Sequence, residues 1–231
     1  MNLNRTAGAS LIVLPVAFNV AFALLGQNFQ YPDILRQPTA VVLGQFAAGG
    51  APLVATWYAF MLSAVLFVPA AILLGRTLKA TAPSLMSLAV PIGILAGSVQ
   101  FIGLSRWPFV VPYLAGAYLA PGATLATREA IEIAFQVLNR YAGMAIGEHL
   151  GYLFTGAWTL LVSAALLSSQ FQLKRGLAWI GVVSAIGILA GLLEGVGFGA
   201  AGAINAISYI VWSVWLIGLG AVLISKRQPS T

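Results

Sequence analysis

The sequence predicts an all-α membrane protein, a bundle of about six transmembrane helices with an extra amphipathic helix on the outer side. Hydrophobic residues make up 60% of the 231 residues and charged residues only 7%, whereas soluble domains are about one quarter charged. Six apolar segments also reach the roughly 20 residues that a helix needs to cross the hydrocarbon of a bilayer. None of them alternates apolar and polar residues as the strands of a membrane barrel do. Helices are therefore expected, because they satisfy their own backbone hydrogen bonds inside lipid.

The six segments follow one another along the chain, each bounded by charge, proline or glycine. They cover residues 7–26, 51–75, 84–105, 143–168, 177–197 and 204–225. No linker or low-complexity stretch divides them, so residues 1–231 are expected to form a single polytopic membrane domain. The first segment is too long for the apolar core of a signal peptide and lacks a clear cleavage site, so we interpret it as a retained span.

The charged residues predict the orientation of the spans. With the N-terminus in the cytoplasm, every lysine falls inside, and the acidic residues fall outside or in the outer half of a span. The inner basic residues are Arg5, Arg76, Lys79, Lys174, Arg175, Lys226 and Arg227, and the outer ones are Arg36, Arg106, Arg128 and Arg140. Cytoplasmic loops are enriched in Lys and Arg, so both termini are expected to be cytoplasmic.

Two outer segments are too long to be simple turns. In residues 27–50, Pro32 and Pro38 can each open a short helix, and we expect one or two helical turns that end at Gly49-Gly50. In residues 106–121, three prolines alternate with Trp and Tyr. Proline interrupts helices and these aromatic residues prefer the membrane interface, so we expect a broken segment that lies at or dips into the outer interface.

Residues 123–140 form an amphipathic pattern. Apolar residues recur at helical spacing, opposite the polar ladder Arg128, Glu132, Gln136 and Arg140. The pattern fits either an interfacial helix or an extension of the fourth span.

An internal repeat is also suggested by the sequence. The six residues at 92–97 recur identically at 186–191. The match fits parallel repeats of spans two to three and four to five, in which Gln100 would correspond to Glu194. Coincidence among common apolar residues is the alternative.

Five ionisable residues are predicted to converge on the outer edge of the hydrocarbon. Counting about 20 residues from the inner ends of the spans gives Arg106, Arg140, Glu148, His149 and Glu194 similar depths. Ionisable residues in or beside a span mark functional sites by default, here a ligand-binding or ion-pair cluster. The simpler reading is a structural ion pair for each glutamate and an interfacial hydrogen bond for His149.

Glycines flank this cluster on the fourth span. Gly143, Gly147 and Gly151 are spaced by four residues, and small residues at that spacing let a neighbouring helix approach closely. We expect this stripe to serve helix packing.

Several chemistries find no support in the sequence. Cysteine is absent, which excludes disulfides, thiolate catalysis and cysteine metal centres. The sequence has no recognisable metal-ligand spacing and no catalytic or nucleotide-binding motif, so no metal and no cofactor is expected. The basic residues sit at segment ends and form no patch, which argues against nucleic acid as a partner.

Several sequence blocks carry a resemblance to a known family. They are Tyr-Pro-Asp-Ile-Leu-Arg at 31–36, Trp-Tyr-Ala-Phe at 57–60, Arg-Trp-Pro-Phe-Val-Val-Pro at 106–112, Asn-Arg-Tyr at 139–141, Gly-Glu-His-Leu-Gly-Tyr at 147–152 and Tyr-Ile-Val-Trp-Ser at 209–213. In these blocks the chain resembles domain-of-unknown-function family 4386, a group of small bacterial polytopic membrane proteins. The resemblance implies a protein of the bacterial inner membrane and supplies no activity.

Three functional hypotheses follow. The first is a protein that binds or moves a small anionic or lipid-like ligand at the outer charged cluster, where arginines would hold a carboxylate or head group. The second is a non-catalytic accessory or scaffold subunit of a larger membrane complex, which would have a membrane-protein partner or form a homo-oligomer. The third is an intramembrane lipid-modifying enzyme with Glu148 or His149 as general base.

Overall fold

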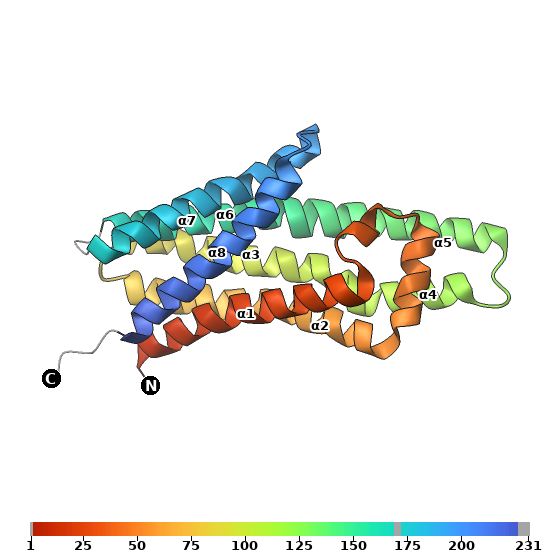
Figure 1. The fold of residues 1–231 in the computed structure, drawn as a ribbon, viewed down its shortest axis with the longest axis horizontal. Helices are drawn as coiled ribbons and strands as arrows, with labels where there is room; N and C mark the ends of the chain where they lie inside the picture. Colours follow the sequence, from red (N-terminus) through yellow and green to blue (C-terminus); the bar gives the residue numbers. More distant parts are fainter. Residues whose placement is uncertain (1, 169–171, 226–231) are drawn as a thin grey trace. The chain divides into compact units, whose positions relative to one another are not determined.

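The computed structural model describes residues 2–168 and 172–225, and helices dominate these residues (Figure 1). The α-helices are α1 (Leu3–Phe29), α2 (Thr39–Leu78), α3 (Pro83–Phe109), α4 (Val111–Leu119), α5 (Leu125–Leu138), α6 (Gly151–Leu167), α7 (Gln172–Ala190) and α8 (Ala201–Ser225). Two short 3-10 helices, η1 (Asp33–Arg36) and η3 (Gly191–Val196), and one π-helix, η2 (Asn139–Leu150), complete the described part of the chain. Lys226 and Arg227, used above for orientation, lie outside the described residues.

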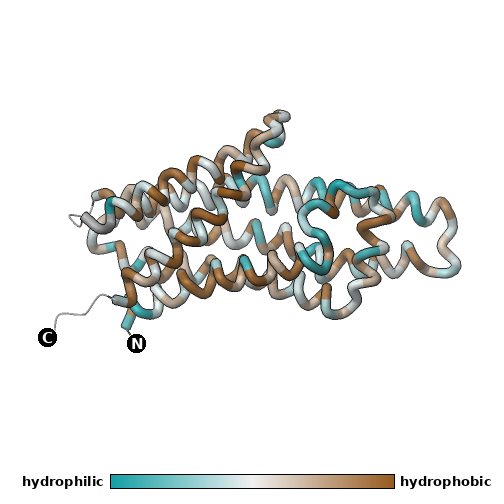
Figure 2. The backbone as a smooth tube through the Cα atoms, in the orientation of Figure 1, coloured by the Kyte–Doolittle hydropathy of each residue, from teal (hydrophilic) through white to brown (hydrophobic). Residues whose placement is uncertain are grey.

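Six helical stretches in the described residues are long and apolar enough to cross a membrane. Apolar residues colour the helices brown in Figure 2, whereas the loop between α1 and α2 is polar. The prediction of an all-α, multi-pass membrane protein with about six spans is confirmed. The orientation of the termini stays a prediction.

The helices extend beyond the predicted spans. The fourth span is the largest difference, because helical residues continue without a gap from Leu125 through η2 to Leu167. Residues 123–140 are therefore an extension of that span in this structure. The helix α5 begins at Leu125 because the Thr124 hydroxyl accepts a hydrogen bond from the Thr127 amide and caps the first turn.

Residues 106–121 are more helical than the prolines suggest. The helix breaks only around Val110, between α3 and α4. Proline lacks an amide hydrogen but is tolerated in the first turn of a helix, and Pro112 stands there in α4. The segment is thus broken once, within the predicted residues, and its position at the outer interface stays a prediction.

A kink divides α2 near its start. Gly50 has φ +54° and ψ −152°, a backbone conformation that is essentially restricted to glycine. The predicted end at Gly49-Gly50 coincides with this kink. It separates residues 39–49 from the long helical stretch that follows.

The described residues fall into two compact units. The first unit comprises residues 2–16, 65–98, 149–168 and 172–225, and the second comprises residues 17–64 and 99–148. Residues of α1, α2 and α3 contribute to both units. The expectation of a single domain over residues 1–231 stays a prediction.

The first unit is held together by α6, α7 and α8, which pack against one another in sequence order. Its core contains Trp158, Trp212 and Trp215. The Trp212 indole donates a hydrogen bond of 2.9 Å to the Thr159 hydroxyl. A buried indole N–H that is paired in this way avoids the cost of an unsatisfied donor.

The second unit has an aromatic core. The indole rings of Trp57 and Trp107 stack with centroids 4.3 Å apart and planes 8° apart. Phe29 and Phe46 pack around the pair, and Phe29 meets both indoles edge-on. Trp57 and Trp107 are fully buried. This core lies directly beside the charged residues described next.

Candidate ligand site around Arg106

Arg106 is a buried cation in the last turn of α3. Only 6% of its surface is exposed. One terminal nitrogen donates to the carbonyl of Gly103, and the other donates to the Asn139 side-chain oxygen at 3.0 Å. The guanidinium carbon lies 5.3 Å from the centre of the Trp107 ring, within the range of a cation–π contact. Burying a charge is costly unless it is paired and hydrogen-bonded, and these contacts meet part of that cost.

Glycines make room for this arrangement. A Cβ added to Gly103 would lie 2.5 Å from the Gly147 Cα, and one added to Gly143 would lie 2.6 Å from the Arg106 guanidinium. The α3 and η2 backbones therefore approach as closely as glycine permits, in the manner of small-residue helix contacts in membranes. Gly143 and Gly147 from the predicted stripe take part. Gly151 is buried in the first unit.

The π-helix η2 supplies the site residues that lie opposite α3. It runs over Asn139–Leu150, and its wider turns follow i→i+5 hydrogen bonding. Such segments occur mostly as single turns inside α-helices, frequently at functional sites. Asn139 stands at its first position and Glu148 near its end, so one continuous segment supplies both residues.

Tyr31, in the loop after α1, is electrostatically coupled to this cluster. Burial raises the pKa of Tyr31 to about 12, the Glu148 carboxylate adds to the rise, and the Arg106 guanidinium opposes it. The Tyr31 ring also meets the Trp57 indole edge-on, with centroids 5.1 Å apart. Tyr31 is therefore a neutral phenol near neutral pH, beside a cation and an anion.

Three buried donors of this cluster have no hydrogen-bond partner among the described residues. They are Arg106 Nε, Trp57 Nε1 and Trp107 Nε1. Arg106 and Trp107 are in cation–π contact and the two indoles stack, so the three donors belong to one cluster. An unpaired buried donor costs about 1–3 kcal/mol. A molecule with acceptor atoms would remove this cost.

We call Tyr31, Trp57, Arg106, Trp107, Asn139 and Glu148 the arginine cluster. Sequence reasoning found Arg106 and Glu148 because charge is rare in spans. It missed the other four as site residues, although all of them lie in the sequence blocks quoted above. For Trp107, the available sequence signal was its position directly after Arg106 at the end of a span.

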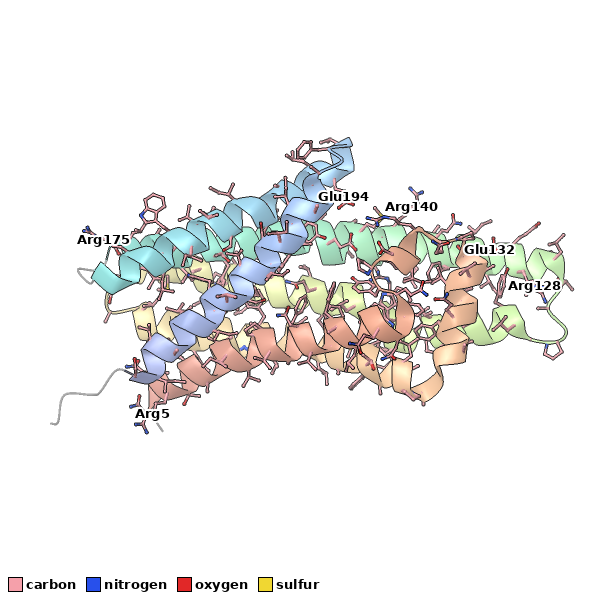
Figure 3. All side chains as sticks on the ribbon, viewed as in Figure 1. Arg5, Arg128, Glu132, Arg140, Arg175 and Glu194 are labelled. Atoms are coloured by element: carbon pink, nitrogen blue, oxygen red, sulfur yellow. The ribbon has the colours of Figure 1, made fainter. Side chains whose placement is uncertain are left out.

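The remaining predicted site residues are exposed in the units to which they belong. Arg140 belongs to the same unit as Arg106 and is exposed (Figure 3). His149 and Glu194 belong to the first unit and are also exposed. The convergence of all five ionisable residues stays a prediction. Within the described residues, no group of three metal-binding side chains lies together.

The predicted polar ladder on α5 is used for packing within the second unit. The Tyr118 hydroxyl donates to Glu132 at 2.8 Å, and the Arg128 guanidinium lies over the Tyr118 ring. These contacts join α4 to α5, with Arg128 and Glu132 labelled in Figure 3.

Comparisons with known proteins identify the family. No curated protein and no solved structure matches the chain. The family described as "Domain of unknown function (DUF4386)" matches residues 6–220, nearly the whole length. This is the family that the sequence blocks suggested, and the chain belongs to it.

Proposed function

We propose that this membrane protein binds a small ligand with hydrogen-bond acceptor groups, such as a carboxylate or phosphate, at the arginine cluster. The single observation that supports the proposal is the set of three buried donors, Arg106 Nε, Trp57 Nε1 and Trp107 Nε1, with no acceptor among the described residues. Arg is suited to carboxylate and phosphate recognition because its donors form a planar fork.

The charge balance of the cluster limits the class of ligand that it can bind. Glu148 already offsets the charge of Arg106, so a strongly charged anion would meet a nearly neutral site. The neutral Tyr31 phenol can add a further donor. The ligand we favour is therefore small, with one anionic group and apolar surface that contacts the two indoles.

The test removes one indole N–H donor and keeps an aromatic ring at the same position. Trp107→Phe deletes the indole N–H while retaining an aromatic side chain, and Trp179→Phe, at an exposed position of α7, is the matched control. Inorganic phosphate and acetate are titrated into purified protein, and binding is measured as the rise of the unfolding temperature. We expect wild type and Trp179→Phe to be stabilised by at least one of the anions, and Trp107→Phe to respond about tenfold more weakly. No stabilisation of the wild type by either anion would contradict the proposal.

A second candidate function is that of an accessory subunit that docks a protein partner. It is favoured by an unpartnered apolar face on α5. Ile131 and Phe135 are buried within the second unit, whereas Ile133 and Val137 on another side of α5 are 64% and 61% exposed. Since α5 precedes the predicted fourth span, these side chains are expected outside the hydrocarbon, where exposed apolar surface marks interaction sites.

Because the sequence has no cysteine, crosslinking can test this face cleanly. A single Val137→Cys variant is oxidised in native membranes, with Arg128→Cys on the polar side as control. A product specific to position 137, either a dimer or an adduct with another protein, is expected if this face is an interface. Absence of any product would argue against the accessory role.

The proposed location is the bacterial inner membrane, with both termini in the cytoplasm. It is supported by the six apolar helices and by the distribution of lysine and arginine. In this orientation the arginine cluster is expected near the outer leaflet.

A further inference from the structure

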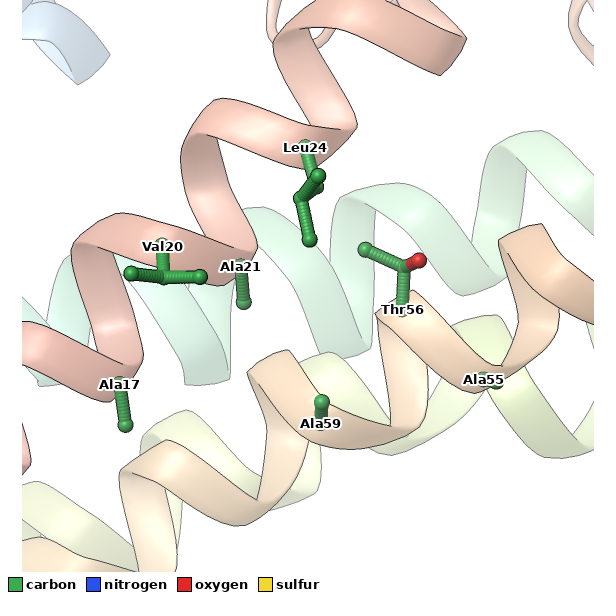
Figure 4. A pocket seen from close by; sticks show the side chains of 7 residues that line it. All are labelled: Ala17, Val20, Ala21, Leu24, Ala55, Thr56 and Ala59. Atoms are coloured by element: carbon green, nitrogen blue, oxygen red, sulfur yellow. The ribbon is translucent and has the colours of Figure 1, made fainter.

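A groove runs between α1 and α2 in the second unit, formed by residues outside the arginine cluster. Its volume is about 420 Å³, within the range of roughly 300–1,000 Å³ for small-molecule sites. It is lined by Ala17, Val20, Ala21, Leu24, Ala55, Thr56 and Ala59. Figure 4 shows these side chains on facing surfaces of the two helices.

Small side chains create this groove. Four of its seven lining residues are alanines, two on each helix. Val20 and Leu24 carry the larger side chains on α1 (Figure 4). A hydrocarbon chain is much thinner than an α-helix, which is about 10 Å across with its side chains, so a volume of about 420 Å³ suits the former better.

The groove continues into a second, more polar hollow. This hollow has a volume of about 250 Å³ and is lined by Asn28, Gly49, Pro52, Leu53 and Thr56. Thr56 lines both parts. From Ala17 to Asn28 the groove follows about 17 Å of α1, at about 1.5 Å per residue, from an apolar end to a polar end.

The polarity of the groove matches the depth of its residues in a membrane. Asn28 is the penultimate residue of α1, whose apolar span is Leu3–Phe29, so the polar hollow lies at the head-group level of that span. The apolar part lies deeper along the same span. An amphiphile with its chain along the helices would meet apolar groups at its tail and polar groups at its head.

From these observations we propose that the α1–α2 groove holds one acyl chain of a membrane lipid, with the polar part of that lipid beside Asn28. Lipid tails are as apolar as leucine, so van der Waals packing rather than hydrophobic transfer retains the chain. The Asn28 side chain already donates to the Leu24 carbonyl at 3.0 Å, which fixes its amide at the polar end. This inference is independent of ligand binding at the arginine cluster.

Photo-crosslinking tests the proposal. The full chain is reconstituted in vesicles of phosphatidylethanolamine and phosphatidylglycerol that contain a phospholipid with a diazirine on one acyl chain. After illumination, labelled peptides are mapped by mass spectrometry. We expect label to concentrate on the α1 and α2 residues that line the groove.

Filling the groove with a larger side chain should remove the preferential labelling of its lining residues. Ala55→Phe places a ring in the groove, and Ala23→Phe introduces the same ring on an exposed part of α1 outside the lining set. Groove labelling should fall about tenfold in Ala55→Phe, the equivalent of roughly 1.4 kcal/mol of binding free energy, and stay unchanged in Ala23→Phe. Should Ala55→Phe fail to fold, Ala59→Leu is the smaller replacement with the same expected direction.

Three outcomes would overturn the proposal. Label spread evenly over the apolar surface of the spans would mean ordinary lipid contact, and label that persists in both filling variants would place the chain elsewhere. Label absent from the groove together with a crosslink to a second protein helix would show a different occupant. Anion binding by Trp107→Phe and wild type is measured separately, so failure of one proposal leaves the other intact.

Discussion

At the scale of single residues, the contact between Gly103 and Gly147 fixes how closely two helical segments approach. Gly103→Ala would place a methyl group 2.5 Å from the Gly147 Cα, and backbone cannot yield as a flexible side chain can. Overpacking of this kind typically costs about 1–3 kcal/mol. We expect a loss of that size in the free energy of unfolding, measured by denaturant titration in mixed micelles.

Gly116→Ala provides the control for this substitution. A Cβ at Gly116 in α4 would meet nothing within 4 Å, so alanine there should be neutral or stabilising by roughly 0.5–1 kcal/mol through its helix propensity. Equal losses for Gly103→Ala and Gly116→Ala would show that the close approach does not matter.

Tyr31 predicts a pH dependence of stability. Its pKa is about 12 in the folded protein, against about 10 for an unperturbed tyrosine. Below pH 10 the phenol is protonated in both states, and above it the unfolded state ionises first. Stability should therefore fall as the pH rises from about 10 to about 12, and this part of the fall should vanish in Tyr31→Phe.

Absorbance of the phenolate measures the same ionisation directly. The difference between wild type and Tyr31→Phe isolates one titration, and Tyr113→Phe, which removes an exposed phenol, controls for the loss of one tyrosine. A Tyr31 midpoint at the ordinary value would contradict the desolvation of the phenol and the influence of the Glu148 carboxylate on it.

At the scale of elements, the kink in α2 depends on one glycine. Gly50→Ala forces a Cβ into a backbone region that costs of the order of 1–3 kcal/mol for other residues. Gly44→Ala lies in the same helix with nothing within 4 Å of its new Cβ and a negative φ. Thermal unfolding should show a loss for Gly50→Ala and none for Gly44→Ala, and equal behaviour would mean that residues 39–49 tolerate a straight α2.

The helices also show which parts of the fold the sequence patterns could predict. The apolar runs predict all six spans because burial in lipid demands about 20 apolar residues whatever the neighbours are. The helicity of residues 106–121 was missed, because a proline count does not reveal that Pro112 falls in a first turn. The π-helix η2 was missed too, because i→i+4 and i→i+5 bonding suit the same apolar and glycine spacings. Arg106 could be predicted as a site residue because charged residues are rare in spans. Asn139 and Tyr31 join it through tertiary contacts that no local pattern encodes.

At the scale of the whole molecule, the orientation in the membrane can be checked with reporters. Alkaline phosphatase inserted at 120–124 should be active, because that loop is expected outside, and a fluorescent protein fused after Thr231 should fluoresce in the cytoplasm. The physical reason is the retention of Lys and Arg on the cytoplasmic side. The opposite pattern at both sites would reverse the orientation and move the arginine cluster to the inner leaflet.

The π-helix has a mechanical consequence. Helical residues run unbroken through Asn139–Leu150, and a π-turn and an α-turn each make one backbone hydrogen bond per residue. Rewinding part of η2 from i→i+5 to i→i+4 bonds would therefore keep the helix whole while turning Glu148 about the helix axis relative to Asn139. Because the α3 and η2 backbones touch at Gly103 and Gly147, that rotation would bring a residue with a Cβ to the contact, so the two segments would have to move slightly apart. The movement that this segment permits is a screw, in which the carboxylate turns toward or away from Arg106 without a break in the helix.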